Sequence, residues 1–179
     1  MQFKTSPDNT ESPARTFSGY ASLFALTDLS GDIIEPGAFS ASLKRYANIP
    51  MLWQHQADNP IGVWVKITLD QHGLYVEGQL AQGVKRADEA WQLMTAGALD
   101  GLSIGFRTMR SKKTAGNRHI LEADLWEISL VTFPMMPHAR VNRLNKAAQI
   151  NAAQHLKNHT AISAARIIRH AAARLRLST

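Results

Sequence analysis

Alternating apolar positions predict a β-hairpin near the middle of the chain. Every second residue is apolar in the run Ile61, Val63, Val65, Ile67 and Leu69. This two-residue period is typical of a strand with one buried face. The turn-forming run Asp70-Gln71-His72-Gly73 follows, and the alternation resumes at Leu74, Val76 and Leu80. We therefore expect two antiparallel strands joined by a tight turn.

Further short strands and two helices are predicted around this hairpin. Strand character covers residues 17–26, 51–55, 102–109 and 125–133. Apolar residues at steps of three and four predict an amphipathic helix over residues 84–98, and Pro36-Gly37 precedes a short helix at 38–46. Residues 111–119 are polar and basic and are expected to form a hairpin loop. Many short strands with few helices favour a mainly β fold, namely an antiparallel β-barrel with peripheral helices.

The composition excludes several kinds of site. The 179 residues include no cysteine, so disulfides, thiolate zinc sites and cysteine nucleophiles are absent. The seven histidines show no metal-ligand spacing such as H-E-x-x-H, so we expect no metal and no cofactor. No run approaches the roughly 20 apolar residues of a membrane span. The polar residues 1–15 do not resemble a signal peptide.

The positive charge is concentrated after Glu127. Of the net charge of +6, residues 128–179 carry eight Lys or Arg and no acidic residue, whereas residues 1–127 sum to −2. We therefore divide the chain into a flexible lead (1–14), a β-barrel domain (15–143) and a basic, Ala-rich helical tail (144–179). The tail is interpreted as a segment that docks on a protein partner. Phosphate contacts with nucleic acid are the less favoured alternative.

Three short segments each place one reactive side chain among apolar neighbours. They are Leu52–His55, Gly101–Phe106 and Leu125–Leu130, and their polar residues include His55, Ser103 and Glu127. A histidine, a hydroxyl and a carboxylate are the base, nucleophile and orienting anion of a serine hydrolase. Taken singly, Ser103 is more typical of a sheet serine and His55 of a structural histidine, and Glu127 is also compatible with a solvated residue on the outer face.

Strand periodicity says where these side chains should point. We expect Ser103 and Glu127 on the face opposite to their bulky apolar neighbours, with Trp126 facing the core. His55 is expected at the end of a strand, just before a turn at Asp58-Asn59-Pro60. The Gly101-x-Ser103-x-Gly105 run matches the α/β-hydrolase motif only superficially. That motif needs a strand before the serine and a helix after it, whereas here the predicted order is reversed.

Five segments together resemble the tailed-phage prohead serine protease family, which is similar to herpesvirus assemblin. In chain order they are Gly19–Phe24, Gly31–Phe39, Leu52–His55, Leu102–Phe106 and Leu125–Pro134. The resemblance implies a β-barrel of the herpesvirus-protease type. It also implies an endopeptidase that cuts scaffold and capsid precursor inside the procapsid, in the host cytoplasm or, for a prophage, in the bacterial cytoplasm.

The resemblance also assigns residue roles. It implies that His55 is the general base, Ser103 the nucleophile and Glu127 the third member of the triad. Asp124, Glu122 and His119 stay open as rivals for the third place. The loop at residues 135–140 is a candidate source of oxyanion donors, through its backbone or through Arg140. Two other functions stay open, a catalytically silent assembly protein on the same barrel and a nucleic-acid-binding module. Homo-oligomerisation is likewise left open.

Overall fold

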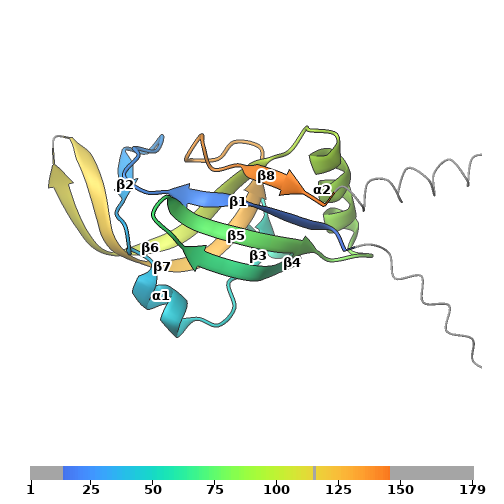
Figure 1. The fold of residues 1–179 in the computed structure, drawn as a ribbon, viewed down its shortest axis with the longest axis horizontal. Helices are drawn as coiled ribbons and strands as arrows, with labels where there is room; N and C mark the ends of the chain where they lie inside the picture. The colour runs from blue at the N-terminus through green and yellow to red at the C-terminus, as the bar shows by residue number, and fades with distance from the viewer. Residues whose placement is uncertain (1–13, 115, 146–179) are drawn as a thin grey trace, which may run out of the picture. The chain divides into compact units, whose positions relative to one another are not determined.

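Eight strands and two helices form the part of the chain that the computed structural model describes, residues 14–114 and 116–145 (Figure 1). The strands are β1 (Thr16–Leu23), β2 (Asp32–Ile34), β3 (Met51–Trp53), β4 (Gln56–Leu69), β5 (Gly73–Leu80), β6 (Gly101–Thr114), β7 (Asn117–Val131) and β8 (Val141–Leu144). The helices are α1 (Ser40–Arg45) and α2 (Lys85–Thr95). The predicted lead at residues 1–14 and tail at 144–179 lie almost wholly outside the described residues.

The β4–β5 hairpin confirms the first prediction, but its outer face differs from the expected one. Ile61 is buried, whereas Val63 and Val65 are 61% and 63% exposed. The register of the two strands shifts between Trp64 and Lys66, which leaves Val65 as an extra residue in β4. A β-bulge of this kind interrupts the strict two-residue alternation. A second shift, in the pairing of β4 with β3, leaves Ile61 as an extra residue and separates it from Val63. The apolar run therefore does not share one buried face.

The β6–β7 hairpin is longer than predicted. Residues 111–119, expected as a loop, belong mostly to the two strands, and the pairing continues out to Thr114 opposite Asn117. This distal part, coloured yellow in Figure 1, extends past the rest of the sheet. Its strand residues in β6 are exposed on both faces. Exposed strands need no apolar alternation, so the sequence pattern did not reveal them.

The central strand of the site region is β7, which is paired on both edges. Strand β6 runs antiparallel along one edge, while β2 and β3 pair with the other edge in parallel. Helix α1 lies between these two short strands, and its buried Ser42 Oγ accepts a hydrogen bond of 2.8 Å from the Leu125 N–H of β7. The segment from β2 to β3 thus lies along one edge of β7, and the C-terminal end of β3 lies beside that strand.

The predicted antiparallel barrel is wrong in two respects. The pairing of β2 and β3 with β7 is parallel, and within the described residues the sheet is not closed. Strand β8 pairs with the Phe17–Gly19 part of β1, and the segment that precedes it reaches β6 only at the isolated bridge between Gly101 and Arg140. Strands β1 and β6 therefore lie near each other without a hydrogen-bonded ladder. The coarser prediction, a mainly β fold with few helices, is confirmed.

Candidate active site

His55 lies in a tight turn, not at a strand end as predicted. Gln54 and His55 are the two loop residues between β3 and β4, and Trp53 pairs with Gln56 across them. Their φ angles are +50° and +61°. Two consecutive positive φ angles are what a type I′ hairpin turn requires, and Asn-Gly usually supplies them. For two side-chain-bearing residues this backbone costs about 1 kcal/mol or more each, so surrounding contacts must hold it. The expected turn at residues 58–60 instead lies within β4.

Hydrogen bonds to β7 and its C-terminal end hold this turn. The Gln54 N–H donates to the Leu130 carbonyl at 2.9 Å. The Gln54 amide donates to Thr132 Oγ1 at 2.9 Å and accepts from the Thr132 N–H at 3.3 Å. The His55 N–H donates to Ser129 Oγ at 3.0 Å. The backbone that carries the imidazole is therefore attached to the strand that carries Glu127.

The His55 ring and the Glu127 carboxylate form a hydrogen bond. His55 Nδ1 lies 2.7 Å from Glu127 Oε1. The imidazole is 45% exposed, whereas the carboxylate is only 13% exposed. This hydrogen bond raises the pKa of His55 above its ordinary value, and the negative charge of Glu127 adds to the effect, although burial opposes it. With Nδ1 bonded to the carboxylate, Nε2 is left as the ring nitrogen that can accept a proton.

The backbone around Glu127 makes room for its carboxylate. Gly105 of β6 is the cross-strand partner of Glu127. A Cβ atom at Gly105 would lie 2.3 Å from Glu127 Oε1, so a glycine is required for the observed conformation. The register shifts beside this pair and leaves Trp126 as an extra residue in β7. Trp126 is 57% exposed, so the prediction that it faces the core is wrong.

Ser103 lies close to this pair in the sheet. It is the cross-strand partner of Ser129 and is 5% exposed. Directly opposed residues share a sheet face, and Ser129 is two positions after Glu127, so these side chains point to one side. His55 and Ser103 line the same cavity of about 350 Å³, which is also lined by Ala21, Ser22, Asp28, Ser30, Asp32, Ile34, Ile104, Gly105, Phe106, Arg118, Met135 and Met136. Within residues 14–114 and 116–145, no hydrogen bond joins Ser103 Oγ to the His55 ring.

The rivals for the third position have other partners. The Asp124 carboxylate is 3% exposed and lies between the guanidinium groups of Arg45 at 3.0 Å and Arg107 at 2.8 Å. Among the described residues, neither Glu122 nor His119 hydrogen-bonds to the His55 ring and, like Glu127, neither lines the cavity. Their nearest charged partners are Arg110 for Glu122 and Glu35 for His119. Of the four acid or histidine candidates, only Glu127 contacts His55 among the described residues.

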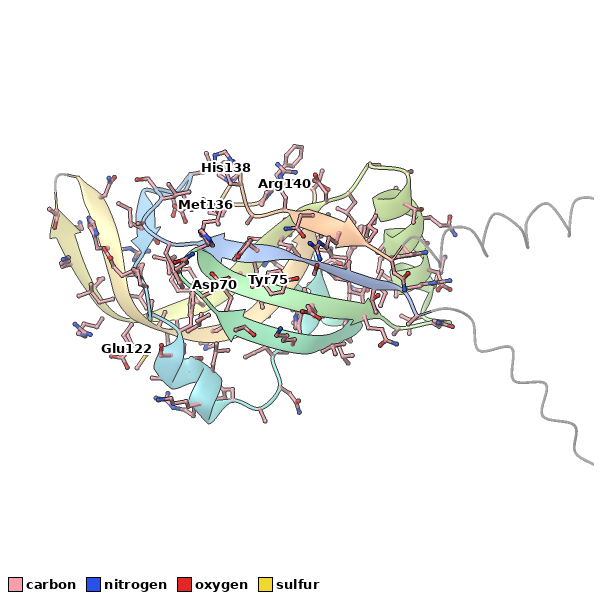
Figure 2. The ribbon with its side chains drawn as sticks, in the orientation of Figure 1. Asp70, Tyr75, Glu122, Met136, His138 and Arg140 are labelled. Carbon is pink, nitrogen blue, oxygen red and sulfur yellow. The ribbon has the colours of Figure 1, made fainter. Side chains whose placement is uncertain are left out.

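The loop after β7 reaches the cavity through its methionines. Figure 2 shows Met136, His138 and Arg140 along this loop, between β7 and β8. Met135 and Met136 line the cavity. The Arg140 guanidinium instead donates to Asp100 at 2.5 Å and to the Pro137 carbonyl at 2.9 Å. The side chain of Arg140 is therefore held by other partners and does not line the cavity.

The described part of the chain lacks the features of two other kinds of site. It contains no group of three or more His, Cys, Asp or Glu that could hold a metal ion. It also contains no helix long and apolar enough to span a membrane.

Comparison with known sequences identifies relatives among phage proteins. A family model described as "Caudovirus prohead serine protease" matches residues 2–155. The chain is 34% identical over 147 residues to the prohead protease of Enterobacteria phage HK97, covering 79% of this chain and 65% of that protein. It is also 34% identical over 135 residues to a capsid polyprotein of Pseudomonas phage PAJU2, covering 71% of this chain and 20% of that protein. The chain therefore spans less than two thirds of the length of either relative.

Comparison with solved structures identifies the fold. The bacteriophage T4 capsid assembly protease aligns with a TM-score of 0.55 at 10% identity, covering 65% of this chain and 81% of that one. A herpesvirus protease, that of KSHV in complex with a hexapeptide phosphonate inhibitor, aligns with a TM-score of 0.53 at 12% identity, covering 82% and 77%. At such identities the likeness concerns the fold, which resembles that of the herpesvirus proteases.

Proposed function

This chain belongs to the caudovirus prohead serine protease family, and from that premise we propose that it is a serine endopeptidase of procapsid maturation. In this proposal Ser103 is the nucleophile, His55 the general base and Glu127 the residue that orients the base. The observation that carries it is the hydrogen bond between His55 and Glu127 beside a cavity that Ser103 also lines. The strained turn at His55 adds support, because such strain is concentrated at functional sites.

In the proposed mechanism His55 accepts and passes on one proton in each of two half-reactions, acylation and deacylation. Ser103 Oγ attacks the peptide carbonyl while His55 Nε2 accepts the hydroxyl proton. His55 then donates this proton to the leaving amine, and an acyl-enzyme ester remains on Ser103. Water then attacks the ester while His55 Nε2 accepts one of its protons. His55 returns this proton to Ser103 Oγ as the ester C–O bond breaks, so the acid product leaves and the Ser103 hydroxyl is restored. Throughout, Glu127 holds the proton of Nδ1 in place and stabilises the imidazolium that forms at each transfer.

In this proposal the hydrogen bond between Ser103 Oγ and the His55 ring forms when the substrate binds. Catalytic hydrogen bonds are often long before substrate binds and tighten in the complex. Ser103 Oγ has no competing partner among the described residues, so its hydroxyl is available to the imidazole. The raised pKa of His55 is in keeping with a base that must accept and hold a proton.

The proposed substrates are the capsid protein precursor and the scaffold, cleaved inside the procapsid in the host cell. The names of the HK97 and PAJU2 relatives, a prohead protease and a capsid polyprotein, support this choice. We also propose, from the sequence, that the basic tail at residues 144–179 docks on scaffold.

Coexpression with the cognate capsid precursor tests the activity. We expect the unmodified chain to cleave the precursor and Ser103→Ala to leave it intact. The matched control is Ser18→Ala, because Ser18 is another buried strand serine but does not line the cavity. Equal cleavage by Ser103→Ala and the unmodified chain would exclude Ser103 as the nucleophile. No cleavage by any of the three proteins would favour the silent assembly protein.

A further inference from the structure

One buried hydroxyl connects the two partners of the His55–Glu127 pair. Ser129 Oγ accepts a hydrogen bond of 3.0 Å from the His55 N–H and donates one of 2.6 Å to Glu127 Oε2. A serine hydroxyl has one donor and two acceptor positions, so it makes both bonds at once. Ser129 has no exposed surface, and it does not line the cavity that His55 and Ser103 share.

These two bonds restrict the carboxylate plane of Glu127 and the backbone of His55, neither of which the His55–Glu127 bond fixes by itself. Glu127 Oε1 is held by the imidazole, so the bond from Ser129 to Oε2 fixes the orientation of the carboxylate plane. The bond from the His55 N–H fixes the backbone of a residue with φ of +61°. Without Ser129, that N–H loses its partner and a strained turn loses one of its anchors.

We propose that Ser129 is a positioning residue of this site. It fixes the imidazole of His55 and the carboxylate of Glu127 in the relative orientation that their hydrogen bond requires. The inference rests on the proposed function for its kinetic consequence, but the positioning itself is a property of the folded protein. Ser129 acts through His55 and Glu127, since it does not line the cavity and, among the described residues, makes no hydrogen bond to Ser103 Oγ. The Gln54–Thr132 bonds form a second, exposed anchor of the same turn.

The first test is an NMR titration of the His55 imidazole in the full chain, with Ser103→Ala as background to prevent self-cleavage. We expect Ser129→Ala to lower the pKa of His55 toward its ordinary value of 6.5, because the bond that raises this pKa is no longer held from both sides. The matched control is Ser42→Ala, since Ser42 is also fully buried and accepts a backbone bond from β7. An unchanged or higher pKa of His55 in Ser129→Ala would overturn the proposal.

The second test is the kinetics of precursor cleavage with Ser103 intact. We expect Ser129→Ala to reduce kcat by about 10- to 100-fold, the usual effect of a small misplacement of catalytic groups, with KM little changed. Ser129→Cys keeps the size of the side chain but weakens both hydrogen bonds, so it should give a smaller loss in the same direction. It also replaces Ser129→Ala in both tests if the alanine variant does not fold.

The two tests separate failure of this inference from failure of the proposed function. A chain that cleaves no precursor even without substitution refutes the proposed function, while the His55 titration still decides the role of Ser129. A folded Ser129 variant whose His55 pKa is unchanged, or whose kcat is unchanged, refutes the positioning role while leaving the proposed protease activity intact.

Discussion

Gly105→Ala should abolish the proposed precursor cleavage while leaving the fold in place. The added Cβ would lie 2.3 Å from Glu127 Oε1 and 3.0 Å from both Cδ and Cγ of the same side chain. All three contacts involve the flexible end of Glu127, so the carboxylate can rotate away instead of forcing the strands apart. Gly105 does not have a positive φ, so an alanine adds no backbone strain at this position.

The size of the loss follows from what Glu127 would no longer do. A displaced carboxylate cannot keep its 2.7 Å bond to His55 Nδ1, so the imidazole loses its orientation and the stabilisation of its charged form. Removal of the orienting acid from a serine protease triad costs about 10⁴-fold in kcat. Each tenfold loss corresponds to about 1.4 kcal/mol of transition-state stabilisation, so we expect a barrier increase of up to about 5.5 kcal/mol.

A double-mutant cycle with Glu127→Ala tests this reasoning. The rate of precursor cleavage is measured by gel electrophoresis for the unmodified chain, Gly105→Ala, Glu127→Ala and the double variant, and thermal unfolding confirms that each is folded. If the added methyl acts only through Glu127, Gly105→Ala should have almost no further effect once the carboxylate is gone. Additive losses would refute the reasoning, because they would show that Gly105 acts independently of Glu127. A Gly105→Ala variant with full activity would also refute the reasoning.

Three further predictions concern pH and stability. Cleavage needs neutral His55, so the cleavage rate should rise with pH through the raised pKa of this residue. In a pH–rate profile, Glu127→Gln should move this rise to lower pH and reduce the plateau rate. A rise at the same pH in both proteins would contradict the prediction. Because the pKa of His55 is raised on folding, the His55–Glu127 pair stabilises the fold fully below the ordinary value of 6.5. This contribution is lost as the pH rises through the folded-state pKa. The difference in unfolding free energy between the unmodified chain and His55→Ala, measured in urea, should therefore shrink as the pH rises. Asp124→Asn should reduce the free energy of unfolding by about 1–3 kcal/mol without lowering kcat, since the buried Asp124 carboxylate contacts two arginines and not His55; a large loss of kcat at unchanged stability would restore Asp124 as a candidate.

Much of the site could be predicted from local sequence. Ser103 and Glu127 are polar residues within apolar strands, and this contrast is visible without any structure. Ser129 was also within reach, because residues two apart in a strand share a face and Ser129 follows Glu127 at that distance. Gln54 carried no such signal, since its role depends on the turn that it forms with His55.

The sequence by itself indicated most of the strands and singled out the polar side chains of the proposed triad, because two-residue alternation and isolated polar residues are local properties of the chain. It did not indicate the exposed distal parts of β6 and β7, which lack such alternation. Only the tertiary structure decided how strands that are not joined by a short turn pair with each other. The parallel docking of β3 on β7 brings the His55 turn to Glu127, and an extra residue at Trp126 sets the register beside it. Strand pairing joins residues more than 70 positions apart, as in the His55–Glu127 bond. No local pattern encodes such a pairing, and a single bulge reverses the face on which every later residue lies.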